Sequence, residues 1–112
     1  MSPEQKPAPE VRVSRELFDL LKNLESNHKF IKWINEMKDK LLFNMLSGGS
    51  IQKRRIPKHY REKYGVNNLY RYEHPEGYRS CYTLVNMEGV GVCPIILDLL
   101  SHPEYERIFG YR

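Results

Sequence analysis

The chain of 112 residues has only two cysteines, Cys81 and Cys93, and no Cys-x-x-Cys motif. Its four histidines show no metal-ligand spacing with the cysteines, so we expect no zinc site, no other metal and no cofactor. A disulfide between neighbouring strands is conceivable. Two reduced thiols that serve as small apolar groups are the preferred interpretation.

Long apolar segments are also missing. No apolar run approaches the ~18 residues of a membrane span, and the first ten residues, MSPEQKPAPE, lack the apolar stretch of a secretory signal. Their three prolines and lack of aromatic residues predict a disordered tail over residues 1–10, followed by a single domain over residues 11–112. We therefore expect a cytoplasmic protein with no membrane partner.

Positive charge is concentrated in one window of the sequence. The net charge is only +4, and residues 1–50 are almost balanced. Residues 51–72 contain seven Lys or Arg side chains against a single acidic residue, Glu62. Such a field attracts phosphate backbones, although a charged run is more often a solvated loop.

The N-terminal half carries a helical pattern. Ser14 can cap a helix from Arg15, in which apolar residues recur at helical spacing: Leu17, Leu20, Leu21 and Leu24. A second helix is expected from a cap at Asn27 to Gly48-Gly49. Two helices joined by a short link form an αα-hairpin, and the preceding segment EVRV can add a short strand.

The C-terminal half has β-forming residues and short turns. Strands are expected at residues 69–73, 78–85 and about 91–99, linked by the turn-rich sequences HPEG and NMEG. A helical turn can follow Pro57, and SHPEYERIFGYR predicts a brief turn or helix at the end. The predicted fold class is α+β, with the αα-hairpin packed on one face of a small antiparallel sheet and the other face partly open.

The hairpin sequence LYRYEHPEGYRSCYTLV, residues 69–85, resembles the RelE/ParE-like toxins of type II toxin–antitoxin systems, as does the order of elements over residues 11–112. The resemblance implies a metal-independent endoribonuclease that cleaves mRNA, commonly on the ribosome. In that reaction the 2′-hydroxyl of the RNA attacks the adjacent phosphate, which leaves a 2′,3′-cyclic phosphate and a 5′-hydroxyl. The implied partners are mRNA, the ribosome and a cognate antitoxin protein.

The resemblance also implies site residues. Arg79 matches the arginine of the family's Gly-Tyr-Arg run, and its planar fork suits phosphate oxygens. His102 and Tyr105 fall where family members place C-terminal catalytic groups, and either can transfer a proton. We expect Arg79 and His102 to act together, with Arg79 opposite about Ile96 in the antiparallel sheet.

RNA binding is assigned to a basic set and one tyrosine: Lys53, Arg54, Arg55, Lys58, Arg61, Lys63 and Tyr72. Several RelE-type ribonucleases carry a lysine pair on the strand before the turn. Here that strand reads Tyr70-Arg71-Tyr72-Glu73, so Arg71 can replace one cation and nothing obvious replaces the second.

Non-functional interpretations of the same residues stay open. Arg79 can form a salt bridge with Glu73 or Glu88, and His102 can serve only in the turn before the last segment. The alternative function is a non-enzymatic binder of the same fold, either a gyrase-directed toxin or a module that binds RNA or protein.

Overall fold

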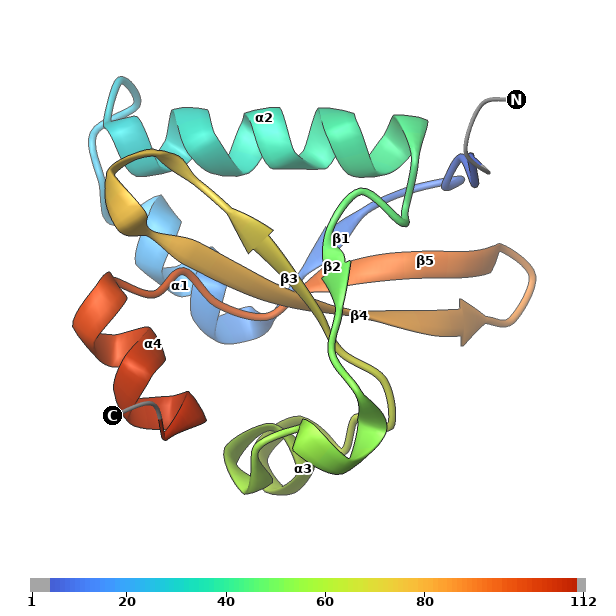
Figure 1. The fold of residues 1–112 in the computed structure, drawn as a ribbon. Helices are drawn as coiled ribbons and strands as arrows, with labels where there is room; N and C mark the ends of the chain where they lie inside the picture. The colour runs from blue at the N-terminus through green and yellow to red at the C-terminus, as the bar shows by residue number, and fades with distance from the viewer. Residues whose placement is uncertain (1–4, 111–112) are drawn as a thin grey trace.

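The computed structural model describes residues 5–110, which form an α+β fold with four α-helices and a five-stranded sheet (Figure 1). The elements in chain order are β1 (Arg12–Val13), α1 (Arg15–Lys22), α2 (Lys29–Phe43), β2 (Gly49–Ser50), the 3₁₀-helix η1 (Lys53–Arg55), α3 (Lys58–Tyr64), β3 (Tyr70–Glu73), the 3₁₀-helix η2 (Pro75–Gly77), β4 (Arg79–Met87), β5 (Gly91–Ile96) and α4 (His102–Phe109).

The sheet is mixed, with the strand order β1-β5-β4-β3-β2. The predicted antiparallel meander of β3, β4 and β5 is confirmed, and β2 pairs antiparallel with β3. The prediction that the whole sheet is antiparallel is wrong, because β1 lies parallel to β5, with Arg12 beside Ile95. Residue alternation identifies a strand, but it does not determine which free sheet edge a two-residue strand will join.

The first two helices lie close to where the sequence places them. The Ser14 hydroxyl accepts a hydrogen bond from the Leu17 amide and caps α1 as predicted. In α2 the predicted cap at Asn27 is wrong, because Nδ1 of His28 accepts from the Phe30 amide at 3.0 Å. The helix also ends at Phe43, before the predicted Gly48-Gly49, and Asn44 follows it in an extended conformation.

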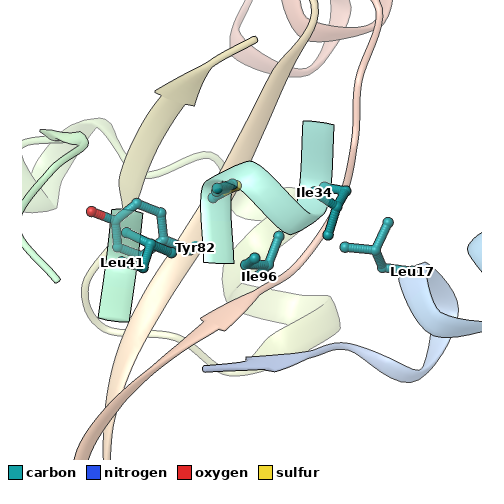
Figure 2. Close-up of a cluster of buried hydrophobic side chains, with 6 residues drawn as sticks. Leu17, Ile34, Leu41, Tyr82 and Ile96 are labelled. Atoms are coloured by element: carbon teal, nitrogen blue, oxygen red, sulfur yellow. The ribbon is translucent and has the colours of Figure 1, made fainter. Parts of the chain in front are cut away.

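Helices cover both faces of the sheet. Figure 1 shows α2 along one face, with α3 and α4 on the other. The α2 side is filled by a cluster of buried residues, most of which Figure 2 labels: Leu17, Ile34, Met37, Leu41, Tyr82 and Ile96. Because successive residues of β4 point to opposite faces, Cys81 enters a second cluster with Ile56, Tyr60, Leu69 and Leu97. The expectation of a partly open second face is therefore wrong over the part of the sheet that α3 and α4 cover.

The segment between α2 and β2 makes a close backbone approach to the sheet. The Tyr82 hydroxyl donates to the Met45 carbonyl at 2.8 Å and accepts from the Gly48 amide at 2.9 Å. A Cβ at Gly48 would lie 2.6 Å from the Arg71 carbonyl oxygen, so the chain needs glycine here.

The predicted tail over residues 1–10 is described from residue 5 onward. Its backbone makes two contacts near the end of α2: the Ala8 amide donates to the Leu42 carbonyl, and the Met45 amide donates to the Lys6 carbonyl. Both cysteines are buried and unbonded to each other. Within residues 5–110, no helix combines the length and apolar character needed to cross a bilayer.

Candidate active site

Two strands and the last helix bring four of the predicted site residues together. Arg71 of β3 is paired with Cys81 of β4, and Arg79 lies two residues before Cys81. Both arginines therefore project from the same face of the sheet, the face on which α4 lies. Helix α4 supplies His102 from its first position and Tyr105 from its first turn.

The contacts among these four side chains are direct. Nη1 of Arg79 lies 2.9 Å from Nδ1 of His102, and the Arg79 guanidinium carbon lies 4.8 Å from the centre of the Tyr105 ring. Nη1 of Arg71 donates to the Tyr105 hydroxyl at 3.1 Å. We call these four residues, Arg71, Arg79, His102 and Tyr105, the arginine–histidine cluster.

A β-bulge brings the start of α4 to Arg79. The Leu97 amide donates to the Cys81 carbonyl, and the Leu100 amide donates to the Arg79 carbonyl. Two residues, Asp98 and Leu99, thus lie opposite the single residue between Cys81 and Arg79, which is the arrangement of a bulge. The expected register is wrong mainly because the β4–β5 turn lies further along the chain, with Met87 opposite Gly91 and Tyr82 opposite Ile96. The bulge adds one more residue of shift, so Arg79 bridges Leu100 instead of Ile96.

The sequence around His102 fixes where α4 begins. The Ser101 hydroxyl accepts from the Glu104 amide, and the Glu104 carboxylate accepts from the Ser101 amide, which completes a capping box. Pro103 in the first turn has no amide hydrogen to leave unsatisfied. His102 is therefore held at a defined helix start beside Arg79.

His102 and Tyr105 differ in their access to solvent. Tyr105 is only 2% exposed, so its ring supports Arg79 and its hydroxyl orients Arg71 from inside the fold. His102 is exposed. Because Arg79 donates to Nδ1, the hydrogen of a neutral His102 ring lies on Nε2, which is 3.3 Å from a Glu106 carboxylate oxygen. His102 is thus the cluster member best placed to exchange a proton with a bound molecule.

The salt bridges proposed for Arg79 do not form. Among residues 5–110, no carboxylate lies within ion-pair distance of Arg79, and its buried Nε atom has no hydrogen-bond partner. Glu73 instead contacts Arg71, with Nη2 of Arg71 3.4 Å from a Glu73 oxygen. Because Glu73 is the strand partner of Arg79, its exposed carboxylate lies on the same face of the sheet as the arginines, although the sequence predicted for it only an ion pair with Arg79.

The six predicted RNA-binding cations are all exposed, but they have different surroundings. Lys58 pairs with Glu62, and Lys63 pairs with Glu16 at 2.8 Å. Arg61 donates to the carbonyls of Ile56 and Lys53, so it holds η1 against α3. The remaining three, Lys53, Arg54 and Arg55, form η1. The segment is therefore a basic turn joined to a charge-paired helix.

Tyr72 does not join the predicted RNA-binding group. It alternates with Arg71 on β3, so its side chain faces α2, where it packs against the first buried cluster. His74, the first residue of the turn sequence HPEG, is buried and stacks on Trp33, with Nε2 2.8 Å from the Ser80 hydroxyl oxygen. Burial lowers the pKa of His74 to about 4.

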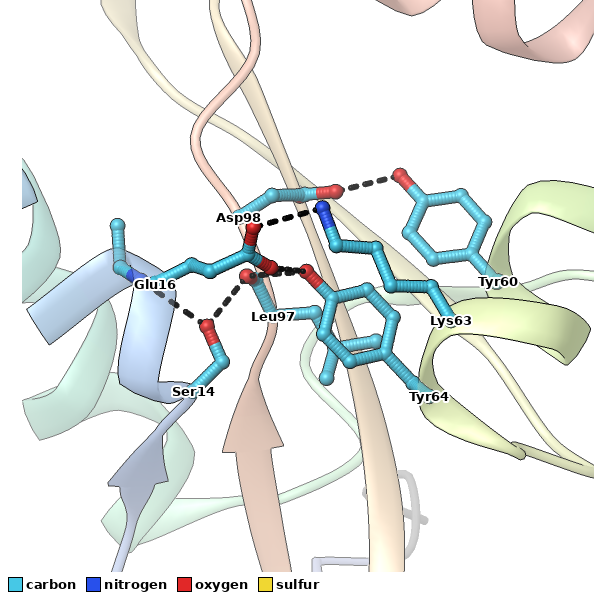
Figure 3. Close-up of polar contacts among 8 residues, drawn as sticks. Ser14, Glu16, Tyr60, Lys63, Tyr64, Leu97 and Asp98 are labelled. Carbon is cyan, nitrogen blue, oxygen red and sulfur yellow. Dashed lines mark hydrogen bonds and ion pairs between the residues drawn. The ribbon is translucent and has the colours of Figure 1, made fainter.

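A half-buried carboxylate near the cluster, Asp98, was not identified from the sequence. Asp98 accepts from the Tyr60 hydroxyl at 2.6 Å and from the Cys81 amide at 2.8 Å, the amide that the bulge leaves without a backbone partner. Burial raises the pKa of Asp98 to about 6 and outweighs these two hydrogen bonds. Figure 3 shows Asp98 beside the network that joins α1 to α3, in which Glu16 contacts Lys63 and Tyr64. An aspartate two residues beyond a strand gives no sequence signal of this role.

No protein-family model matches the chain, and no curated protein or solved structure matches it significantly. Within the described part of the chain, no group of three or more His, Cys, Asp and Glu side chains is arranged to hold a metal ion. The cluster can nevertheless bind an anion through two guanidinium groups and transfer a proton through an imidazole.

Proposed function

We propose that this protein is a metal-independent endoribonuclease of the RelE/ParE-like toxin superfamily that cleaves mRNA, commonly on the ribosome. The observation that carries the proposal is the contact between Arg79 and His102, with Arg71 and Tyr105 beside them. The order of two helices before an antiparallel β3–β5 meander supports the proposal.

The chemistry needs one proton removed and one supplied. A base takes the proton from the 2′-hydroxyl, the 2′-oxygen attacks phosphorus, and the bond from phosphorus to the 5′-oxygen breaks as that oxygen gains a proton. The products are a 2′,3′-cyclic phosphate and a 5′-hydroxyl. No electron acceptor or water molecule is consumed in this step.

Arg79 is proposed to bind the non-bridging oxygens of the scissile phosphate, where negative charge increases in the transition state. His102 is proposed to supply the proton to the leaving 5′-oxygen, because it is exposed and adjacent to Arg79. Glu73 is proposed as the base, since its exposed carboxylate lies on the same face of the sheet as both arginines. Tyr105 is a positioning residue in this scheme, because its hydroxyl is buried and engaged by Arg71.

This proposal places the protein in the cytoplasm, with mRNA and the ribosome as substrates and an antitoxin as its inhibitor. An acidic, partly apolar antitoxin segment that folds on binding would cover the exposed cations and the arginine–histidine cluster.

A second candidate function is binding without cleavage, by a gyrase-directed toxin or by a module that binds RNA or protein. The observation that favours it is the engagement of Arg71 by Glu73 and Tyr105, together with the absence of the lysine pair found in several RelE-type ribonucleases.

The deciding experiment is cleavage of a defined mRNA by the purified protein in EDTA, with and without programmed ribosomes. The expected result is cuts inside the reading frame that leave 5′-hydroxyl and 2′,3′-cyclic phosphate ends, absent with Arg79→Ala. If wild-type protein makes no such cuts under either condition and induction in cells creates no new mRNA ends, the binding function replaces the enzymatic one.

A further inference from the structure

A cavity of about 570 Å³ lies next to the arginine–histidine cluster, between β2, η1 and α4. Arg71 and Tyr105 belong to both the cluster and the cavity wall. Its other polar side chains come from β2, from η1 and from the residue that precedes η1: Ser50, Arg55 and Gln52. The cavity is within the size range of pockets that hold small organic ligands.

The positive charge of the side chains that line the cavity favours an anionic ligand. Within residues 5–110, the cavity is lined by two arginines and no carboxylate, and one of the two, Arg71, also pairs with Glu73 outside the cavity wall. Arg55 is exposed and makes no ion pair among residues 5–110, whereas the two lysines of α3 are paired with Glu62 and Glu16. A guanidinium, an amide and a hydroxyl in one cavity can hold a phosphate and the polar edge of a base.

The cavity is close enough to the cluster to take part of the same nucleic-acid strand. The guanidinium carbons of Arg71 and Arg79 lie 5.9 and 4.8 Å from the centre of the Tyr105 ring. Arg71 lines the same cavity as Arg55, so a phosphate on Arg79 and a second phosphate on Arg55 can belong to neighbouring nucleotides.

We propose that this cavity is the binding site for the nucleotide that adjoins the cleaved bond. Arg55 contacts the phosphate next to the scissile one, and Gln52 contacts the base. The inference rests on the proposed ribonuclease function for the identity of the strand. Arg55 and Gln52 are specificity-determining residues in this arrangement, and they touch a part of the RNA that does not react.

Binding tests this site independently of cleavage. The probe is a fluorescein-labelled hexaribonucleotide with 2′-O-methyl groups, which cannot undergo 2′-hydroxyl attack, titrated with protein at several salt concentrations. Arg55→Ala is expected to weaken binding about tenfold and to reduce the slope of log affinity against log salt by about 0.7, the value for one phosphate contact on a single strand. The matched control is Lys32→Ala, which removes one exposed positive charge from α2 on the opposite face of the sheet and should change the slope little.

Length dependence separates a local site from a general field. A dinucleotide without terminal phosphates offers only the phosphate assigned to Arg79, so it should bind wild type and Arg55→Ala equally, whereas the hexanucleotide should discriminate between them. Gln52→Ala should alter the preference among hexanucleotides that differ at one base and leave the salt slope unchanged. Equal losses for Arg55→Ala and Lys32→Ala, or no loss for Arg55→Ala with an unchanged melting transition, would overturn the assignment.

The two proposals fail in distinguishable ways. If Arg55→Ala weakens hexanucleotide binding as expected and no RNA is cleaved, the cavity assignment stands and the ribonuclease function falls. If Arg79→Ala abolishes cleavage while Arg55→Ala behaves like Lys32→Ala, the ribonuclease function stands and the cavity assignment falls.

Discussion

Nη1 of Arg79 lies 2.9 Å from Nδ1 of His102, although the two residues are 23 positions apart in the chain. Their backbones are brought together by the bridge between Arg79 and Leu100, in which each amide donates to the other carbonyl. The contact therefore depends on backbone pairing as well as on the two side chains, which gives the pair a defined geometry before any ligand binds.

Arg79→Ala is expected to reduce RNA cleavage by at least about 10²-fold, the typical loss for removal of a transition-state donor. Arg79→Lys should restore little, because an ammonium group cannot reproduce the planar fork. Single-turnover cleavage rates give the measurement, and Arg107→Ala is the control for loss of an exposed arginine from the same region. Wild-type rates in Arg79→Ala with a normal melting transition would place the site elsewhere.

His102→Gln should lose cleavage but keep RNA binding, because glutamine retains a polar side chain and cannot transfer a proton at neutral pH. Anisotropy with an uncleavable RNA measures binding, and end mapping measures cleavage. A variant that loses both in parallel would indicate that His102 shapes the binding surface rather than the proton transfer.

Tyr105→Phe separates positioning from proton transfer. The buried ring stays beneath Arg79, and only the hydroxyl that Arg71 contacts is removed. We expect cleavage to fall by less than the ~10²-fold loss at Arg79, with the pH profile of the rate unchanged. A loss as large as that of His102→Gln, with an altered pH profile, would make Tyr105 the proton donor.

The approach of the chain to Tyr82 predicts a difference between adjacent glycines. Gly48→Ala would place a methyl group 2.6 Å from the Arg71 carbonyl oxygen and 2.7 Å from the Tyr82 ring, so the backbone must move at a cost of about 1–3 kcal/mol. Gly49→Ala has no atom within 4 Å of its added carbon and should be nearly neutral by comparison. Denaturant unfolding measures both, and equal stabilities would contradict the packing seen at Gly48.

Much of the fold follows from local sequence signals, and the site only partly does. The Ser14 cap, the helix after Pro57 and the β3–β5 meander are set by neighbouring residues, and they are found where predicted. The nearness of Arg79 to His102 follows from antiparallel pairing alone, to within a few residues.

The remaining features depend on contacts that no local pattern encodes. The bulge at Asp98 shifts the register by one residue, and it is stabilised by a side chain that bonds to Cys81 across the sheet. The packing of α3 and α4 on the second face depends on Tyr60 and Phe109 meeting the core from distant parts of the chain. The wrong prediction for Tyr72 has a different cause. Strand alternation places Tyr72 and Arg71 on opposite faces of the sheet, so the sequence alone was enough to exclude Tyr72 from the face that bears Arg71.

Two groups whose pKa values are shifted by desolvation, His74 and Asp98, give the folded state opposite dependences on pH. Burial lowers the pKa of His74 to about 4 from the ordinary value of 6.5, so the unfolded chain binds the extra proton and stability falls as pH drops from 6.5 toward 4. Burial raises the pKa of Asp98 to about 6 from 3.8, so the folded chain holds that proton and stability falls as pH rises from 3.8 toward 6. Between about pH 4 and 6 the two effects oppose each other.

Substitution of either residue should therefore reveal the pH dependence of stability that the other residue contributes. His74→Gln is expected to lose stability relative to wild type by an amount that grows as pH rises from 4.5 to 6.5, because wild type regains the His74 contribution over that range. Asp98→Asn should differ from wild type in the opposite direction, each with a limiting slope of about 1.4 kcal/mol per pH unit. Denaturant unfolding of the three proteins at matched pH values measures these differences, and groups common to all three cancel in the comparison. A stability difference between Asp98→Asn and wild type that stays constant from pH 4.5 to 6.5 would show that Asp98 does not titrate as a buried carboxyl in the folded protein.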